Sequence, residues 1–341
     1  MLKIFARLIL VNLFVAVVLM LVPVLGMATA QEDVIAAAAD AYLNNPNTAF
    51  NISSKVLMEQ MLGDNPPLVI SLRKAEDFAL GHVPGAVNMS FGTLFESASL
   101  SALPDDSKII VYCYTGHTAS MASALLNMCG YDTTNLKWGI MDWSKDPAVA
   151  TAQFVNPESD LPVETAVNEA TATYERPAVD VTSSSVDSEL IRAACYAYAN
   201  AGAKYIKAGD LLNLIMDGDD NNDPVIVSIR SAAQYAKGHI PGAINIPFKD
   251  IAKVENLEKL NPDKQIVVYC YPGRTASQAT AILNTLGYDA RNLLWGMTGW
   301  TTDPEIAPYR FDPAQGANYP VKASEEAVAA PSDDSDGGCG G

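Results

Sequence analysis

Apolar segments of strand length alternate along the chain with longer stretches of helical composition. The strand candidates are rich in Val, Ile, Leu and Tyr, and they are residues 68–72, 108–113, 225–229 and 265–270. Residues 118–130 and 275–287 follow two of them, read as helices, and end at a glycine. This alternation predicts an α/β fold, with mainly parallel β-sheets flanked by helices on both faces.

The same pattern occurs twice. Residues 81–88 (GHVPGAVN) return as residues 238–245 (GHIPGAIN), and VYCYTGHTAS at 111–120 returns as VYCYPGRTAS at 268–277. A repeat of this length is a duplicated domain rather than a solenoid. We predict two tandem domains, with residues 31–150 as unit 1 and residues 187–312 as unit 2.

The remaining residues have a different composition. Residues 151–186 combine three prolines with a Thr-Ser-Ser-Ser run, which predicts a linker. Residues 313–341 are acidic, small and glycine-rich toward the end, which predicts a disordered tail.

The first thirty residues have the layout of a secretory signal peptide. Lys3 and Arg7 precede an apolar run over residues 8–25, and Ala28-Thr29-Ala30 closes it with a cleavage site. We predict cleavage after Ala30 and export to the periplasm. The alternative is an uncleaved anchor in the inner membrane that faces the periplasm, since 18 apolar residues nearly suffice for a span. Membrane contact is expected only in that case.

Charge and cysteine content exclude several classes of partner. The net charge of −17 argues against binding of nucleic acid, so an anion site must be built locally from backbone amides or a nearby cation. The chain has five cysteines and three histidines, without a Cys-x-x-Cys pair, so no metal site and no cofactor is expected. Cys129 and Cys195 are read as core residues, with a disulfide between them as the alternative.

Cys113 and Cys270 are the candidate nucleophiles. Each ends an apolar strand and precedes a helix by a few residues. At the carboxyl end of a parallel strand, loop amides and the helix dipole favour thiolate over thiol. Glycines for the tight turn and threonines for the helix caps follow in both loops: Gly116, Thr118, Gly273 and Thr275.

The motif C-x-x-G-x-T-A-S after VVYC, with GHIPGAIN upstream and NLLWGMTGW downstream, resembles the rhodanese sulfurtransferases. The resemblance implies two rhodanese-like domains that move sulfur from a small anionic donor such as thiosulfate to a thiol or cyanide acceptor. Cys113 and Cys270 would hold the sulfur as persulfides. The implied substrate-binding residues are Tyr114, Thr115, Gly116, His117, Thr118, Tyr271, Pro272, Gly273, Arg274 and Thr275.

Two departures from the family pattern stand out. The family's Asp-x-Arg is Ser71-Leu72-Arg73 in unit 1 and Ser228-Ile229-Arg230 in unit 2. Each arginine therefore either pairs with another acid or binds the anionic donor. The second departure lies within the chain: His117 and Arg274 occupy the same loop position, and only the arginine has a permanent charge. We predict that unit 2 is the faster enzyme near neutral pH.

The same loops bear on three other functions. A phosphatase loop of the form Cys-x5-Arg would need arginine where Ala119 and Ala276 stand, which argues against phosphate chemistry. The main alternative is a persulfide carrier that passes sulfur to a protein partner with little turnover on small molecules. A scaffold with inert loops does not account for the cysteine in both.

Overall fold

The computed structural model describes residues 31–324, except for residues 153, 155, 156, 158, 159, 182, 183 and 315. The predicted signal peptide and Cys339 lie outside the described residues. Of the helices that are described, none has the length and apolar character needed to cross a membrane.

Unit 1 contains one parallel sheet with strand order β1-β5-β4-β2-β3. A helix over residues 31–44 precedes it. Its elements are β1 (Asn51–Ile52), α2 (Ser54–Met61), β2 (Leu68–Ser71), α3 (Ala75–Leu80), β3 (Val87–Asn88), α4 (Phe91–Leu94), α5 (Ser97–Ser101), β4 (Ile109–Tyr112), α6 (His117–Met128), β5 (Thr133–Leu136) and α7 (Ile140–Trp143).

Unit 2 repeats this arrangement with strand order β6-β10-β9-β7-β8, again all parallel. Its elements are α8 (Asp187–Ala201), β6 (Tyr205–Ile206), α9 (Ala208–Met216), β7 (Val225–Ser228), α10 (Ala232–Tyr235), β8 (Ile244–Asn245), η1 (Phe248–Asp250), α11 (Val254–Leu257), β9 (Ile266–Tyr269), α12 (Arg274–Thr285), β10 (Ala290–Leu293) and η2 (Gly296–Gly299). The predicted fold class, two parallel α/β sheets flanked by helices, is confirmed.

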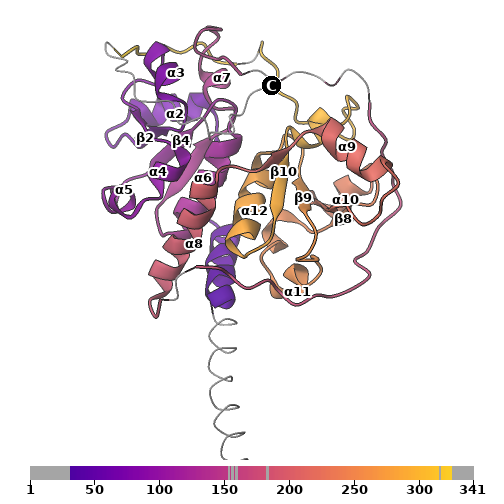
Figure 1. Cartoon of the computed structure of the whole chain (residues 1–341). Helices are drawn as coiled ribbons and strands as arrows, with labels where there is room; N and C mark the ends of the chain where they lie inside the picture. The colour runs from indigo at the N-terminus through magenta and orange to yellow at the C-terminus, as the bar shows by residue number, and fades with distance from the viewer. Residues whose placement is uncertain are drawn as a thin grey trace, which may run out of the picture.

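The central strands β4 and β9 explain why their sequences are continuously apolar. All four residues of each strand are buried, because helices cover both faces of the sheet. α6 and α12 follow these strands and pack against each other where the two units meet (Figure 1). The two cysteine loops therefore lie at the inter-unit boundary.

The first helix of each unit packs against the other unit. Tyr198 of α8 donates its hydroxyl to Met121 Sδ of α6 at 3.2 Å, and α8 also contacts α4. From the helix over residues 31–44, Asn44 donates to the carbonyl of Lys249 at 3.2 Å. Figure 1 shows this helix beside α12 and shows α8 beside α6. The two units are thus intertwined rather than merely adjacent.

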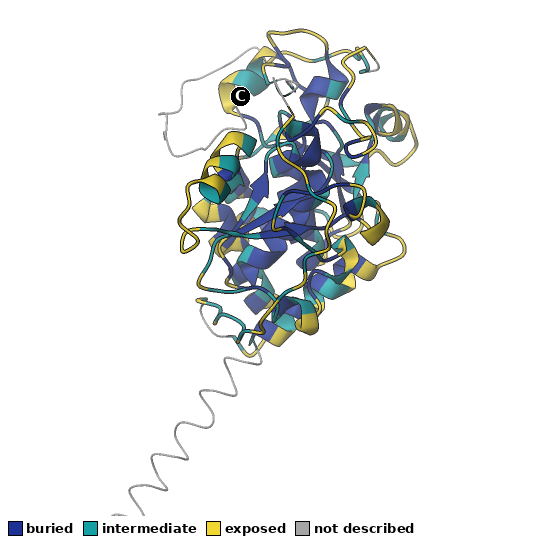
Figure 2. Ribbon diagram, turned by 90° about the vertical axis from the view of Figure 1, so that its right-hand side faces the viewer, coloured by how far each residue is buried: buried dark blue, intermediate teal, exposed yellow. Residues whose placement is uncertain are grey.

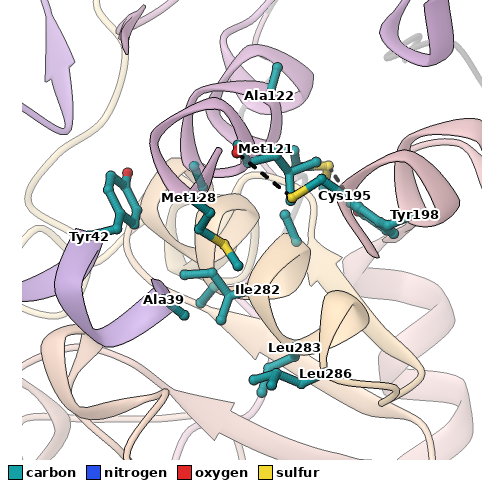
Figure 3. Packing of buried hydrophobic residues seen from close by; sticks show 14 of the residues in the cluster. Ala39, Tyr42, Met121, Ala122, Met128, Cys195, Tyr198, Ile282, Leu283 and Leu286 are labelled. Carbon is teal, nitrogen blue, oxygen red and sulfur yellow. Dashed lines mark hydrogen bonds between the residues drawn. The ribbon is translucent and has the colours of Figure 1, made fainter. Parts of the chain in front are cut away.

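One apolar core runs through both units as a result. A single cluster of buried residues contains side chains from both N-terminal helices, α6 and α12 (Figure 3). Figure 2 shows buried residues concentrated in the middle of the molecule and exposed residues around it. Burial on this scale couples the stability of the units, because separating them would expose apolar area to water at a large cost in free energy.

Two short extended segments outside the sheets also pack on the units. The linker strap, residues 161–164, contacts unit 2, where the Trp300 indole donates to the Pro162 carbonyl at 2.7 Å. The C-terminal strap, residues 319–322, contacts unit 1, where the Trp143 indole donates to the Pro320 carbonyl at 3.0 Å. Each strap also forms an antiparallel bridge with the turn histidine of its unit, at His239 and His82.

The C-terminal strap differs from the disorder predicted for residues 313–341. Lys322 and His82 exchange two backbone hydrogen bonds, of 2.9 and 3.0 Å, and the Tyr319 N–H donates to the Trp143 carbonyl at 2.9 Å. Tyr319 and Val321 also pack against the apolar cluster of unit 1. These residues are ordered because their backbone forms hydrogen bonds with unit 1 and their apolar side chains pack against it. The acidic, glycine-rich composition of the whole tail does not reveal these few residues. Residues 325–341 lie outside the described part.

Candidate active site

The two cysteines lie where the sequence predicts, directly after the central strands β4 and β9. The N-cap of the following helix is a glycine in the left-handed region in both loops, with φ of +91° at Gly116 and +87° at Gly273. The predicted caps, Thr118 and Thr275, are instead the second residues of α6 and α12. Glycine is required because few other residues adopt this conformation without strain.

A second glycine, which follows the last strand of each sheet, packs against the backbone of each cysteine loop. The carbonyl of Cys113 accepts from the Ile140 N–H at 2.9 Å, and that of Cys270 accepts from the Met297 N–H at 3.0 Å. Gly139 and Gly296 lie directly against these carbonyls, so a Cβ at either position would clash with the loop backbone. The repeated Trp-Gly pair after β5 and β10 is therefore a support for the cysteine loop.

The sulfur of Cys113 accepts a hydrogen bond from the loop backbone. The Gly116 N–H donates to Cys113 Sγ at 3.2 Å, and the side chains of Cys113 and Cys270 are 1% and 5% exposed. A donor aimed at the sulfur stabilises negative charge there, as a thiolate or a persulfide requires. In unit 1 the loop backbone thus aims one donor at the sulfur.

The tyrosines that follow the cysteines have different partners in the two units. The Tyr114 hydroxyl donates to the Asp77 carboxylate and accepts from the Lys74 N–H at 3.1 Å. Burial, with Asp77 in support, raises the pKa of Tyr114 and keeps it protonated. Tyr271 instead packs edge-on against Tyr309, with ring centroids 5.0 Å apart.

Within the described part of the chain, no acid forms an ion pair with Arg73 or Arg230, and both arginines donate to uncharged oxygens. Arg73 donates to the carbonyls of Asp77, Gly81 and Val149 at 2.7–2.9 Å. Arg230 donates to the carbonyls of Gly238 and Ile306 and to the Ser228 hydroxyl. Both side chains are buried, and each lies over a loop tyrosine. Buried cations that satisfy backbone carbonyls hold the loop's surroundings together, which favours a structural role, and donor binding at these positions stays a prediction.

His117 crosses into unit 2. Its imidazole is fully buried, with Nδ1 at 2.8 Å from Thr115 Oγ1 and Nε2 at 2.9 Å from the Pro272 carbonyl oxygen. Burial and the nearby Arg274 lower the pKa of His117 to about 3. The side chain is therefore neutral at physiological pH, and it contacts the opposite loop rather than the mouth of its own.

Arg274 crosses in the other direction, into unit 1. Its guanidinium stacks on the Trp138 ring at 3.5 Å from the centroid and is almost fully buried. Burial lowers the pKa of Arg274, and the attraction of Cys270 and Asp142 opposes that shift. The structure thus places a positive charge within electrostatic reach of Cys270, whereas His117, at the equivalent position of the Cys113 loop, is neutral.

The turn histidines are structural. His82 and His239 each use Nδ1 on the carbonyl four residues earlier, at 2.8 and 2.9 Å, and each stacks on the aromatic ring at that position. Among the described residues, no group of three or more His, Cys, Asp or Glu side chains could hold a metal ion.

Cys129 and Cys195 are free thiols whose side chains meet at the packing of α8 on unit 1. Cys195 Sγ lies 3.8 Å from the Leu125 carbonyl oxygen. A side-chain hydrogen bond with Cys129, together with burial, raises the pKa of Cys195. Both cysteines are thus packing residues, as the first of the two sequence interpretations has it.

Sequence reasoning missed that residues of one unit complete the loop surroundings of the other. The available signals were two. His117 and Arg274 stand at one of the two positions where the repeated loop sequences differ, and the Pro-Val of the linker strap recurs as Pro320-Val321. Neither signal shows which unit these side chains or straps contact.

Comparison with known proteins agrees with this geometry. Residues 54–146 and 207–303 each match the rhodanese-like domain family. The thiosulfate sulfurtransferase PspE of Escherichia coli is 41% identical over 64 residues, covering 18% of this chain and 60% of its own. A sulfurtransferase of Allochromatium vinosum is 34% identical over 92 residues, covering 26% of this chain and 84% of its own. The human thiosulfate:glutathione sulfurtransferase is 30% identical over 114 residues, covering 29% and 95%.

Among solved structures, thiosulfate sulfurtransferase from Pseudomonas aeruginosa aligns with 84% of this chain and 48% of its own, at 13% identity and a TM-score of 0.29. For the first two curated relatives, the matched region spans only 47% and 60% of their length. The family match covers more than half of the chain, and it contains both cysteine loops. The chain therefore belongs to the rhodanese-like domain family and carries two tandem domains of it.

Proposed function

We propose that this protein is an exported sulfurtransferase that moves sulfane sulfur from a small anionic donor, such as thiosulfate, to a thiol or cyanide acceptor. Cys113 and Cys270 carry the sulfur. The observation that carries this proposal is the Cys113 sulfur, held at 3.2 Å from the Gly116 N–H in a loop that recurs around Cys270. The relatives named as sulfurtransferases support the same chemistry.

The reaction proceeds in two displacements. A cysteine thiolate attacks the outer sulfur of thiosulfate, so that a Cys Sγ–S bond forms while the bond to the sulfite group breaks and sulfite leaves with the electron pair. The resulting persulfide anion has the charge of the thiolate it replaces. Attack by cyanide or by a second thiolate on the outer sulfur then forms thiocyanate or a new persulfide and restores the cysteine thiolate.

The residues of the chain contribute charge stabilisation and shielding. The Gly116 N–H faces the negative charge that develops at Cys113 Sγ, and the left-handed conformation of this glycine allows the loop to wrap closely enough for it to do so. The near-complete burial of the sulfurs favours donors as small as thiosulfate. A chain with a net charge of −17 offers no long-range attraction to anions, so recognition depends on these local groups.

Export to the periplasm is part of the proposal and rests on the sequence of residues 1–30 alone. An uncleaved inner-membrane anchor is the alternative. Sequencing the N-terminus of protein from the periplasmic fraction tests this point. A mature chain that begins at Gln31 supports cleavage and export, and a chain that retains residues 1–30 contradicts cleavage.

The carrier function remains as a second candidate, because burial would also protect a persulfide from small acceptors. Intact mass spectrometry of the protein with and without thiosulfate tests both candidates. We expect wild type to gain the mass of one sulfur at each loop, Cys113→Ala and Cys270→Ala to gain one fewer, and Cys195→Ala to match wild type. If a variant that carries both Cys113→Ala and Cys270→Ala gains as much sulfur as wild type, these two cysteines are not the sulfur carriers. Steady turnover with cyanide supports the enzyme, and stoichiometric loading that then stops supports the carrier.

A further inference from the structure

A hydrogen-bonded chain joins the two cysteine loops through His117. The acceptor at Nε2 is the Pro272 carbonyl at 2.9 Å, and a carbonyl oxygen can only accept, so Nε2 bears the proton. Nδ1 is then the acceptor for the Thr115 hydroxyl at 2.8 Å. The chain runs from the Cys113 loop to the Cys270 loop, and its two ends occupy the same loop position, two residues after each cysteine.

The imidazole has little freedom to leave this arrangement. Its ring is fully buried and meets the Trp295 ring edge-on, with centroids 4.8 Å apart. A Cβ added at Gly273 would lie 2.9 Å from His117 Nε2, so the loop backbone and the ring are already in close contact. With its low pKa, His117 keeps one neutral tautomer over the physiological pH range.

The geometry of the peptide unit links the Pro272 carbonyl to the sulfur site. In a trans peptide the carbonyl of one residue and the N–H of the next point in opposite directions, and the described residues contain no cis peptide. The N–H that belongs with the Pro272 carbonyl is that of Gly273. Its counterpart in unit 1, the Gly116 N–H, donates to Cys113 Sγ at 3.2 Å, whereas the described residues show no such bond to Cys270. Holding the Pro272 oxygen therefore fixes the orientation of the Pro272–Gly273 peptide, which belongs to the loop around Cys270.

We propose that His117 is a positioning residue for the site of the other unit: by holding the Pro272 carbonyl, it fixes the Pro272–Gly273 peptide of the loop that surrounds Cys270. This inference rests on the proposed role of Cys270 in sulfur transfer. The dependence runs in one direction. Arg274, the counterpart of His117, stacks on Trp138 instead, and its Nη1 has no hydrogen-bond partner among the described residues.

The test isolates Cys270 in a Cys113→Ala background and then changes His117. In His117→Leu we expect kcat for thiosulfate:cyanide transfer to fall about tenfold with a smaller change in KM, the scale of one lost hydrogen bond to a charged centre. His117→Gln places an N–H donor near the Nε2 position, and we expect it to retain kcat within about threefold. Ser123→Ala is the matched control, since its hydroxyl bonds to the Thr133 carbonyl within unit 1.

A second readout does not depend on sulfur transfer. The rate at which iodoacetamide alkylates Cys270, followed by mass spectrometry, reports how well the loop stabilises the thiolate. We expect His117→Leu to slow alkylation about tenfold at pH 7, and Thr115→Val to slow it less, because that variant removes only the donor to Nδ1. Thr115→Val replaces His117→Leu as the test if the latter does not fold.

The outcomes separate the inference from the function. Slower alkylation in a parent that shows no turnover supports the positioning role and contradicts the proposed function. Unchanged alkylation and turnover in folded His117→Leu overturn the positioning role. A loss that His117→Gln does not restore also overturns it, because ring packing rather than the hydrogen bond would then be responsible.

Discussion

The Cys113 and Cys270 loops have nearly the same sequence and backbone, yet their electrostatic surroundings differ. The Cys113 loop sends a neutral histidine into unit 2, where it is hydrogen-bonded on both nitrogens. The Cys270 loop sends an arginine into unit 1, where it stacks on Trp138. The helices that pack across the units bring the two loops into contact. The difference between His117 and Arg274 at one repeated position therefore makes the two loops electrostatically unequal. Duplication supplied two similar sites, and the interface between them makes the sites unequal.

Removing the cysteines has the largest expected effect. Cys113→Ala/Cys270→Ala is expected to lose all thiosulfate:cyanide transfer. Among the single variants, Cys113→Ala should retain about tenfold more activity than Cys270→Ala, because the Arg274 guanidinium attracts the negative charge that sulfur transfer places on Cys270 and the neutral His117 supplies no such attraction. Steady-state kinetics at pH 7 measures both. Equal residual activities would show that the asymmetry at Arg274 and His117 has no consequence for turnover.

Removal of the C-terminal strap is the next largest change. Deleting residues 313–341 leaves the Trp143 indole without its carbonyl partner and uncovers apolar surface in unit 1. We expect the free energy of unfolding to fall by about 2–4 kcal/mol, as for lost packing with a buried donor unpaired. Guanidinium denaturation followed by tryptophan fluorescence measures it. Deletion of residues 325–341 alone is the control, and a similar loss there would contradict the role of the strap.

Replacing Arg274 by methionine tests the charge without opening a large cavity. Alkylation of Cys270 at pH 7 should slow about fivefold to tenfold, because an apolar side chain on Trp138 no longer favours the thiolate. Stability should change little, since a buried guanidinium with an unpartnered nitrogen contributes little net free energy. Arg192→Met, on α8, is the control. Alkylation at the parent rate would remove the charge argument for unit 2.

At neutral pH the smallest expected effect belongs to His117, whose titration changes the pH dependence of stability only below pH 6.5. The unfolded chain binds a proton at His117 as the pH falls through 6.5, whereas the folded protein does so only near pH 3, the lowered pKa. His117 therefore stabilises the fold above pH 6.5, and this contribution is lost as the pH falls toward 3, at about 1.4 kcal/mol per pH unit. His117→Gln should flatten the decline between pH 6 and pH 4 by that slope, measured by denaturation at each pH. Ser123→Ala should keep the parent slope, and an unchanged slope in His117→Gln would place the titration elsewhere.

Much of the local structure could be predicted from the residues themselves. The apolar runs at 68–72 and 108–113 became β2 and β4, and their repeats became β7 and β9, because a strand covered on both faces must be apolar throughout. The glycines at 116 and 273 marked the turn after each cysteine. The N-caps were misplaced by two residues, since the left-handed glycine itself ends the loop and begins the helix.

The interactions between the units could not be predicted in the same way. Nothing in the spacing of Arg73 shows that three backbone carbonyls surround its guanidinium in place of the missing aspartate. The tail looked disordered by composition, although Tyr319 and Val321 complete the packing of unit 1. Contacts between distant segments depend on the three-dimensional surface that receives a side chain, and a linear pattern does not contain that surface.

The sequence by itself determined the duplicated α/β fold, the family and the position of both cysteines, because hydrophobic periodicity and turn glycines act over a few residues. Only the tertiary structure decided which unit each residue serves. His117 lies in the loop of unit 1 and contacts unit 2, and Arg274 lies in the loop of unit 2 and contacts unit 1. The helices and straps that pack across the two units bring the loops together. The charge around each loop cysteine is therefore a property of the assembled pair of units.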